Sequence, residues 1–233
     1  MVGTTHRKVL LVGASRGLGL AMAGEYVARG ACVVATVRSE RRTALHDLQD
    51  DAEGRLEIEH VDITEPLQVA ALHDRLAGRV FDLLFVNAGV TNPPDQTSAD
   101  VPTDVFNRLM VTNALSPLRV IESLEELVSP VGTIAVMSSG QGSVANNERG
   151  GFEVYRASKS ALNQLMRSYA ARHRGDPRTL LLTAPGWVQT DLGGPGAALT
   201  VDQSIPRLVS VVDAQHGHGG LQYLDYRGEA VAW

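Results

Sequence analysis

The sequence is poor in three features that define large classes of protein. Its single cysteine, Cys32, excludes an intramolecular disulfide and suits a reducing cytosol. Its 21 lysine and arginine residues are scattered and its net charge is −5, so it lacks the basic footprint of nucleic-acid or anionic-membrane binding. No run approaches the roughly 20 apolar residues of a membrane span, and the first apolar run, 9–12, is too short for a secretory signal. We expect a cytoplasmic protein without nucleic-acid or membrane partners.

Short apolar runs alternate with longer amphipathic stretches along the whole chain. Strands are predicted over 9–12, 32–37, 56–60, 81–86, 133–137, 180–183 and 221–224, and helices over 18–29, 40–49, 66–77, 103–128, 154–173 and 201–212. Strands that are apolar throughout indicate a sheet covered on both faces. We therefore predict one α/β domain over residues 1–233: a doubly wound, Rossmann-like, mostly parallel seven-stranded sheet with helices on both faces.

A glycine-rich segment, GASRGLG at 13–19, follows the first predicted strand and opens the first predicted helix. This is the context of a phosphate-binding turn, although a plain glycine-rich turn is the alternative. Gly13 permits a tight turn, Gly17 a close backbone approach, and Gly19 close packing of helix on strand. The helix N-terminus offers free N–H groups to a pyrophosphate, to which Ser15 can add a hydroxyl and Arg16 a cation.

The second predicted strand ends at Val37-Arg38, where many dinucleotide-binding folds place an acid for the ribose 2′-hydroxyl. No carboxylate is present there. Arg38, with Arg16 across the adenosine side, favours a 2′-phosphate, because guanidinium groups bind phosphate well. NADP(H) is therefore the expected cofactor, and a solvated arginine at the start of a helix is the alternative.

Tyr155 and Lys159 lie four residues apart in the predicted helix 154–173, so they share one face of it. Acid/base chemistry near neutrality needs the phenol pKa lowered from about 10 by about three units, or roughly 4 kcal/mol. An ammonium about 4 Å away at an effective dielectric of ~20 supplies about that much. We expect Lys159 to lower the pKa of Tyr155 and the pair to transfer a proton.

Other polar segments follow the predicted strands, at the edge where open α/β sheets bind ligands. Asp62 could accept a hydrogen bond from an adenine amino group, although Thr64-Glu65-Pro66 beside it also resembles a plain helix N-cap. Asn113 lies within a predicted helix, four residues before Pro117, which predicts a kink. The pair His216 and His218 has no Cys, Asp or Glu set to complete a metal site, so we expect no metal.

With these residues assembled, the chain resembles the short-chain dehydrogenase/reductase family, and more specifically its small carbonyl-reductase and C-factor-like branch. The matching motifs are the glycine segment, Val86-Asn87-Ala88-Gly89, Tyr155 with Lys159, and Pro185-Gly186-Trp187-Val188-Gln189-Thr190. The family has Asn where this chain has Val86. The resemblance implies NADP(H)-dependent reduction of a carbonyl, or the reverse, by hydride transfer. Tyr155 would be the acid/base, Lys159 would also bind the nicotinamide ribose, Ser139 would hold the substrate oxygen, and Asn113 would fix a water connecting Lys159 to solvent.

The resemblance also places a cofactor along the edge of the sheet. Asp62, Ile63, Asn87 and Gly89 match positions around adenine and ribose, while Val188 and Thr190 match those holding the carboxamide. The complete expected set is Gly13, Ser15, Arg16, Gly17, Leu18, Gly19, Arg38, Asp62, Ile63, Asn87, Ala88, Gly89, Tyr155, Lys159, Pro185, Gly186, Val188 and Thr190.

The serine is the one position where spacing departs from the family. The family serine precedes the tyrosine by 13 residues, and that position here is Gly142, which has no hydroxyl. We choose Ser139, because it directly follows a predicted strand that can aim its side chain, over Ser143, which would lie out in a loop. The extra residues are then assigned to a surface excursion at 144–151.

Three questions stay open at this point. A nucleotide-sugar epimerase or dehydratase shares the Tyr–Lys pair, although such chains usually carry a larger C-terminal region. A nucleotide-binding regulator or signalling protein with little turnover is the rival from another class. The substrate should be a small molecule bound by residues 140–153 and by the loop 191–199, whose few charges favour a neutral or apolar compound. The family often associates through helices near 103–128 and 154–173, which leaves homodimer, homotetramer and monomer open.

Overall fold

A computed structural model describes residues 7–93 and 95–233. Residues 1–6 and residue 94 lie outside the described residues. The sheet contains seven strands, all paired in parallel, in the order β3-β2-β1-β4-β5-β6-β7. The strands are β1 Lys8–Val12, β2 Cys32–Val37, β3 Leu56–His60, β4 Phe81–Val86, β5 Val128–Met137, β6 Thr179–Ala184 and β7 Gly220–Asp225. The predicted doubly wound α/β fold is therefore confirmed.

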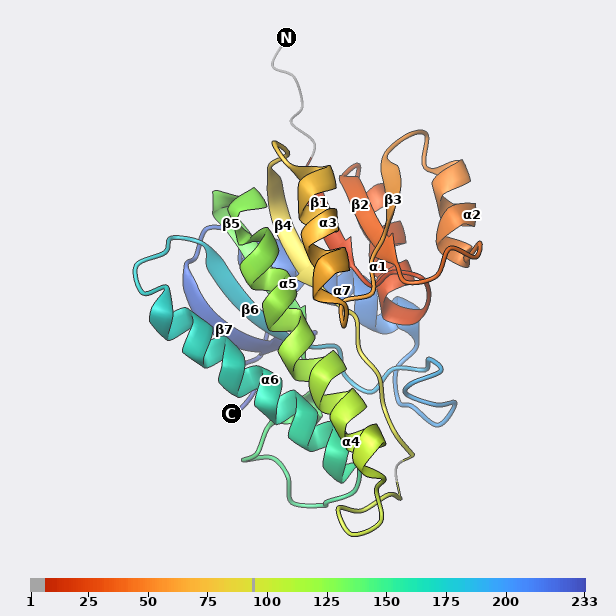
Figure 1. Cartoon of the computed structure of the whole chain (residues 1–233), viewed down its shortest axis with the longest axis vertical. Coiled ribbons are helices and arrows are strands. Elements are labelled where there is room, and N and C mark those ends of the chain that lie inside the picture. The colour runs from red at the N-terminus through yellow and green to blue at the C-terminus, as the bar shows by residue number, and fades with distance from the viewer. Residues whose placement is uncertain (1–6, 94) are drawn as a thin grey trace.

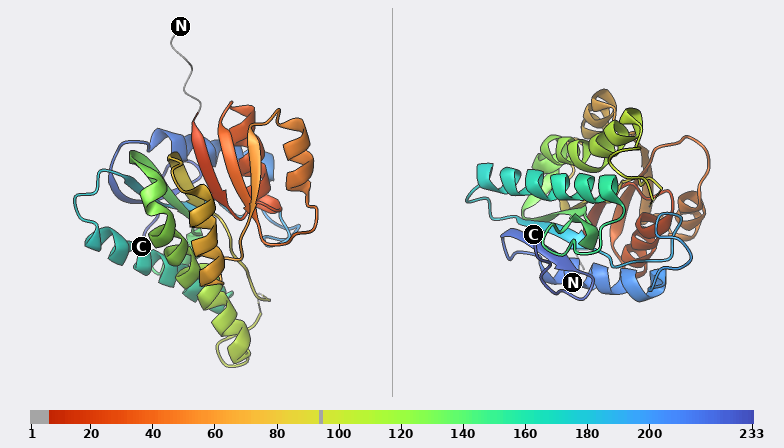
Figure 2. Two further views of the ribbon diagram at one scale, coloured as in Figure 1. Left: turned by 45° about the horizontal axis from the view of Figure 1, so that its top comes forward. Right: turned by 90° about the horizontal axis from the view of Figure 1, so that it is seen from below.

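The helices form a layer on each face of the sheet (Figures 1 and 2). Successive strand residues point to opposite faces, so Leu10 packs under α3, α5 and α6 while Leu11 packs under α1, α2 and α7. This double coverage is the reason that the strands are apolar at almost every position. The helices are α1 Gly17–Ala28, α2 Ala44–Asp51, α3 Pro66–Leu76, α4 Thr103–Met110, α5 Ser116–Leu124, α6 Glu153–Arg172 and α7 Val201–Ala214.

The predicted helix 103–128 proves to be four consecutive segments. Between α4 and α5 lies a π-helical segment, Val111–Leu115, and a 3₁₀ turn, Glu125–Leu127, follows α5. Pro117 is in the first turn of α5 and has no N–H to donate to the preceding turn. The wider π turn accommodates this missing bond, and the backbone stays helical through Val111–Leu115 into α5.

Two element boundaries also differ from the sequence prediction. The helix predicted to begin at 40 begins at Ala44, because Thr43 and His46 form a reciprocal capping box there. The strand predicted over 133–137 begins at Val128, which pairs with Phe81 before the register shifts. The start of α2 follows the carboxyl end of β2, whereas the start of β5 lies at the opposite edge of the sheet.

Strand order reverses between β1 and β4, which are adjacent although the chain winds outward from β1 to β3 in one direction and from β4 to β7 in the other. Open α/β sheets bind ligands at such a switch point. Here α1 approaches β4 so closely that a Cβ on Gly19 would lie 2.1 Å from the Gly13 carbonyl oxygen and 2.6 Å from Asn87 Nδ2. The prediction that Gly19 permits close packing agrees with this geometry.

Two glycines of α1 provide a matched test of that approach. We expect Gly19→Ala to lower the free energy of unfolding by about 1–3 kcal/mol, because the new methyl group meets backbone and a fixed amide. Gly24→Ala, whose Cβ would lie 3.8 Å from Leu48, should stabilise the protein by about 0.5–1 kcal/mol through helix propensity. Thermal unfolding of both variants measures the difference, and equal effects would contradict the proposed packing constraint.

Candidate active site

A cavity of about 950 Å³ opens at the carboxyl ends of the strands. Its walls come from the glycine turn, from the segments that follow β2 to β6, and from the segment that follows β7. Every residue expected to contact a cofactor lines it except Gly19, which packs behind the turn. The cavity is large enough for a sizeable ligand, since such sites typically measure about 300–1,000 Å³.

The glycine turn is held from both sides. The Gly13 N–H donates to Thr36 Oγ1 (3.0 Å), and the Gly13 carbonyl accepts from Asn87 Nδ2 (2.7 Å). Gly13 has φ of +93°, and a Cβ there would lie 2.8 Å from Ala88, so only glycine fits. No side chain caps the start of α1, which leaves its first N–H groups available to an anion.

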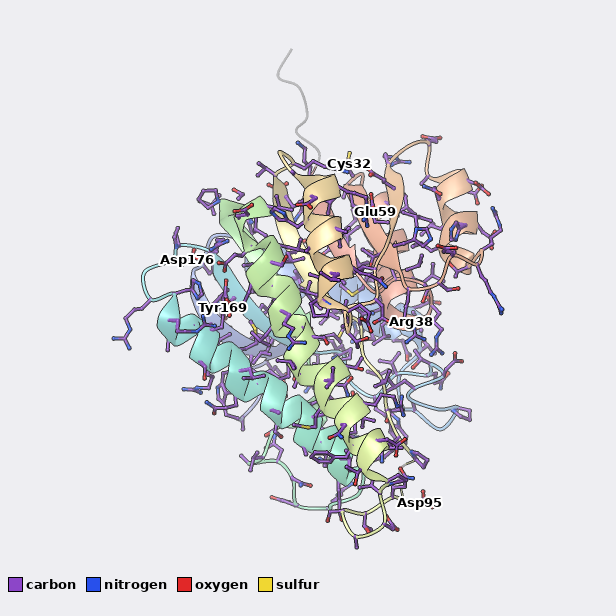
Figure 3. The ribbon with its side chains drawn as sticks, in the orientation of Figure 1. Cys32, Arg38, Glu59, Asp95, Tyr169 and Asp176 are labelled. Carbon is purple, nitrogen blue, oxygen red and sulfur yellow. The ribbon has the colours of Figure 1, made fainter. Side chains whose placement is uncertain are left out.

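The two arginines expected at the adenosine side differ in whether they form an ion pair. Arg38 lies exposed at the carboxyl end of β2 (Figure 3), and within 7–93 and 95–233 no acidic group pairs with it. Arg16 forms an ion pair with Asp191 of the loop that follows β6. The glycine turn is thereby linked across the cavity to that loop, a contact that the sequence did not reveal.

Asp62 lines the cavity while also shaping its own turn. Its Oδ1 accepts hydrogen bonds from the N–H (2.9 Å) and the hydroxyl (2.7 Å) of Thr64. Glu65 is the N-cap residue of α3 and Pro66 lies in its first turn, so Thr64-Glu65-Pro66 does begin a helix. Asp62 still lines the cavity, and its contact with an adenine stays a prediction.

Helix α6 brings Tyr155 and Lys159 to the cavity on one face, as their spacing predicts. Both are buried, at 8% and 3% exposure, and both line the cavity. Lys159 Nζ donates to the Met137 carbonyl at the end of β5 (2.8 Å) and lies 5.9 Å from the centre of the Tyr155 ring. The ammonium is therefore anchored to Met137, the last residue of β5.

Burial, more than charge, determines the acidity of this pair. Burial raises the pKa of Tyr155 to about 12, against a smaller lowering by a hydrogen bond to Ser139. Burial also lowers the pKa of Lys159 to about 8. The expectation that the lysine brings the phenol pKa down toward neutrality is therefore wrong for this structure, because burial dominates the pKa of the phenol and also disfavours the charge of the ammonium.

The structure allows Ser139 to be compared with Gly142 and Ser143, the other two positions considered for the serine. Ser139 lines the cavity, and its Oγ accepts from the Gln141 N–H (3.1 Å) as well as bonding Tyr155. Ser143 is buried outside the cavity and accepts from the N–H of Asn146 (3.1 Å). Gly142 packs on α6 so closely that a Cβ would lie 3.1 Å from the Lys159 backbone. No side chain could replace this glycine without moving the helix.

Asn113 does not line the cavity. It is fully buried in the π-helical segment, where its Oδ1 accepts from the Val90 N–H and its Nδ2 donates to the Val90 carbonyl, both at 2.8 Å. Nδ2 also donates to Ser158 Oγ (2.9 Å). A Cβ on Gly89 would lie 3.4 Å from Asn113 Oδ1 and 3.5 Å from Lys159 Nζ. The side chain therefore stands next to the lysine, and its role through a water stays a prediction.

The loop after β6 is a compact structure that covers one side of the cavity. The Trp187 indole donates to the Gly193 carbonyl (2.8 Å), and Val188 and Leu199 form a short parallel bridge. Trp187 is 57% exposed and lines the cavity, and so does Phe152 from the other loop. Both loops expected at the substrate end therefore reach the cavity, which agrees with the sequence analysis.

Several cavity residues were not found from the sequence. Thr36 is hidden within an apolar strand, and its role became evident only from its bond to Gly13. The end of β7 and the segment after it carry no sequence motif for a ligand site, yet they contribute to one wall. The unpredicted lining residues from this segment are Asp225, Tyr226, Arg227, Glu229, Ala230 and Val231.

A glycine turn at the switch point of a doubly wound sheet, with a buried Tyr–Lys pair across the cavity, defines an oxidoreductase that uses a nicotinamide nucleotide. The family model for short-chain dehydrogenases matches residues 7–197. The chain therefore belongs to the short-chain dehydrogenase/reductase family, and the resemblance stated from its motifs is confirmed.

Two solved structures and one curated protein show which members of the family this chain is similar to. A short-chain dehydrogenase/reductase from Burkholderia multivorans, solved with bound NADP, is 59% identical over 98% of this chain and all of its own, with a TM-score of 0.96. A carbonyl reductase from Pseudomonas aeruginosa PAO1 in complex with NADP is 36% identical over 98% of this chain and 100% of its own, with a TM-score of 0.91. The C-signal protein of Myxococcus xanthus is 36% identical over 65% of this chain and 92% of its own.

The described residues contain neither a candidate metal site nor a candidate membrane-spanning helix. No group of three or more His, Cys, Asp or Glu side chains in 7–93 and 95–233 could hold a metal ion. Over the same residues, no helix is long and apolar enough to cross a membrane.

The buried ammonium generates a testable stability prediction. A pKa lowered from 10.5 to about 8 corresponds to roughly 3 kcal/mol of unfavourable free energy at pH 7, offset in part by the bond to Met137. We expect Lys159→Met, without added cofactor, to raise the melting temperature by a few degrees at pH 7. The cost acts fully below about pH 8, where both states are protonated, and disappears as pH rises toward 10.5, where the unfolded lysine also loses its proton.

The rise in melting temperature caused by Lys159→Met should therefore shrink between pH 7 and pH 10, as melting curves of wild type and variant would show. Lys8, the only other lysine of the chain, is exposed on β1 and supplies the matched control. Lys8→Met should change stability by less than about 0.5 kcal/mol at either pH. A destabilised Lys159→Met protein at pH 7 would contradict the prediction.

Proposed function

We propose that this protein is an NADP(H)-dependent oxidoreductase that reduces a carbonyl to an alcohol, or catalyses the reverse, with Tyr155 as the acid/base. The observation that carries the proposal is the meeting of Ser139, Tyr155 and Lys159 in one cavity with the glycine turn. Three elements distant in the sequence supply these groups, and a hydrogen bond already joins Ser139 to Tyr155.

The residues around the glycine turn fit a dinucleotide. Gly13 allows the turn to lie against Ala88, and the uncapped start of α1 that follows the turn presents N–H groups to an anion. Asp62 and Ile63 would border the adenosine, while Val188 and Thr190 would hold the carboxamide. The cofactor supplies or accepts the hydride; the protein positions the partners and moves the proton.

In the direction of reduction, the site needs a group that still carries its proton at neutral pH. The raised pKa of Tyr155 keeps the phenol protonated, so it can donate to the oxygen of a carbonyl. Ser139 Oγ would hold that same oxygen and so fix the substrate against the phenol. Lys159 would bind the nicotinamide ribose and supply positive charge as the phenolate forms. Asn113 would support Lys159 from behind the cavity.

The substrate would be a small, neutral molecule. Apolar side chains from both loops, Phe152, Trp187 and Leu192, line the cavity. On the β7 side, Arg227 pairs with both Asp225 (3.1 Å) and Glu229 (2.8 Å), which leaves this group of three with a net negative charge. This wall therefore offers no unpaired cation to an anionic substrate.

A regulator without turnover is the second candidate, favoured by the similarity to the C-signal protein. A protein that only binds a nucleotide has no need of a phenol, a hydroxyl and an ammonium around the same point. The presence of all three favours catalysis. A turnover assay with NADPH and a panel of ketones, aldehydes and quinones would separate the two functions.

The assignment of Tyr155 is tested by removing its hydroxyl. Tyr155→Phe should keep NADPH affinity within about twofold and lower kcat at least about a hundredfold, the usual scale for a general acid. Tyr169→Phe is the matched control, because it removes a buried hydroxyl, bonded to Glu125, from the same helix far from the cavity. Wild-type turnover by a folded Tyr155→Phe protein would exclude this role.

Cofactor preference tests Arg38 separately. A charge-assisted contact contributes about 1.5–3 kcal/mol, so we expect kcat/KM to favour NADPH over NADH by about ten- to a hundredfold. Arg38→Asp should abolish or reverse this preference by repelling the 2′-phosphate. Arg108→Asp makes the same charge change at an exposed position on α4 outside the cavity and should leave the ratio unchanged. Equal use of both cofactors by the wild type would refute the argument.

A further inference from the structure

Tyr223 lies on β7, a strand at one edge of the sheet, and its side chain extends toward the residues that follow β5. Tyr223 of β7 pairs in register with Leu182 of β6, yet its hydroxyl donates a hydrogen bond to the backbone carbonyl of Ser139, beyond β6. The side chain is only 3% exposed and packs in the core on the α6 side of the sheet. A residue 84 positions away in the sequence therefore contacts the residue that forms one wall of the active site.

The hydroxyl of Tyr223 lies in a buried polar network. Burial raises the pKa of Tyr223, while hydrogen bonds to the side chains of Asn163 and Ser138 act in the opposite direction. Ser138 Oγ in turn donates to Asn163 Oδ1 (2.6 Å), and Asn163 Nδ2 donates to the Gly142 carbonyl (3.1 Å). The phenol thus stays protonated, as a donor must, and is fixed from several directions.

The C-terminal segment holds this tyrosine in place. The Tyr223 carbonyl accepts from the Val231 N–H (2.9 Å), and its ring packs against Trp233 at 5.5 Å between centroids. Trp233 lies beneath the guanidinium of Arg167 of α6, at 4.3 Å, and its carbonyl accepts from the Ala145 N–H (3.0 Å). β7, α6 and the 140–151 loop are therefore joined around Tyr223.

Ser139 is fixed at both its backbone and its side chain. Its carbonyl accepts from the Tyr223 hydroxyl and from the Gly142 N–H (2.8 Å). Its Oγ accepts from the Gln141 N–H (3.1 Å) and bonds Tyr155. A catalytic group must hold its geometry within a fraction of an ångström, and groups behind it provide that restraint. Without the tyrosine hydroxyl, only the short turn 139–142 would orient this carbonyl.

We propose that Tyr223 is a positioning residue of the active site, which fixes the Ser139 backbone so that the serine hydroxyl meets Tyr155 and the substrate oxygen. This inference rests on the proposed function, because it assigns Tyr223 a role through Ser139. It predicts that the contribution of Tyr223 to turnover exists only while the Ser139 hydroxyl is present.

The test is a double-mutant cycle of Tyr223→Phe and Ser139→Ala, assayed with NADPH and the best carbonyl substrate. Tyr223→Phe should lower kcat about five- to fiftyfold and leave NADPH affinity within twofold, because the cofactor side of the cavity is untouched. In the Ser139→Ala background, the same change should lower kcat by less than twofold further. Tyr169→Phe and Ser143→Ala, which remove buried hydroxyls outside the cavity, should each keep kcat within about twofold.

Hydrogen exchange gives a readout that does not depend on turnover. In Tyr223→Phe, the amide protons of Gln141 and Gly142, both bonded to Ser139, should exchange at least about tenfold faster, while those of β4 stay protected. Unchanged exchange at 141 and 142, or a loss of kcat that multiplies fully with that of Ser139→Ala, would overturn the positioning role. Should Tyr155→Phe keep full activity, the proposed function itself fails, whereas a neutral Tyr223→Phe beside an inactive Tyr155→Phe refutes only this inference.

Discussion

The junction between the ends of β1 and β4 is the contact on which the rest of the site depends. The N–H groups of Asn87 and Ala88 both donate to the Val12 carbonyl, at 2.8 and 3.1 Å, and the Asn87 amide holds the Gly13 carbonyl. These bonds close the sheet where its strand order reverses, with Gly13 pressed against Ala88. The turn, the start of α1 and the floor of the cavity follow from this approach, and a side chain at Gly13 would separate them.

Burial gives the catalytic groups their positions and also determines their charge. The same packing that aims Tyr155 and Lys159 at the cavity raises the pKa of the phenol to about 12 and lowers that of the amine to about 8. The phenol thus holds a proton that it can donate, and the amine, although its pKa is lowered, is still mostly protonated at neutral pH. Sequence spacing correctly placed the two side chains on one face but overestimated the effect of one on the acidity of the other, because spacing contains no information about solvent.

The parts of the structure that local patterns control were predictable. Apolar strands, the glycine turn and the position of Ser139 after β5 follow from short stretches of sequence, and the structure agrees with each. Contacts between distant residues were not: the ion pair of Arg16 with Asp191 joins loops 175 positions apart, and Tyr223 reaches Ser139 across β6. The π-helical segment before Pro117 was also missed, since a proline predicts a lost bond but not how the backbone accommodates it.

The site also contains features that folding alone would disfavour. An ammonium is buried at Lys159 with one carbonyl acceptor among the described residues, and Phe152 at the cavity wall adopts a left-handed conformation with φ of +51°. Each costs on the order of 1–3 kcal/mol, and such costs persist where the surrounding structure enforces them and a function uses them. Both line the same cavity as Ser139 and Tyr155, although the left-handed conformation is shared by Glu53 in the loop before β3, with φ of +51°. The buried lysine therefore costs folding free energy, which its proposed contacts with the nicotinamide ribose and with the phenolate would offset.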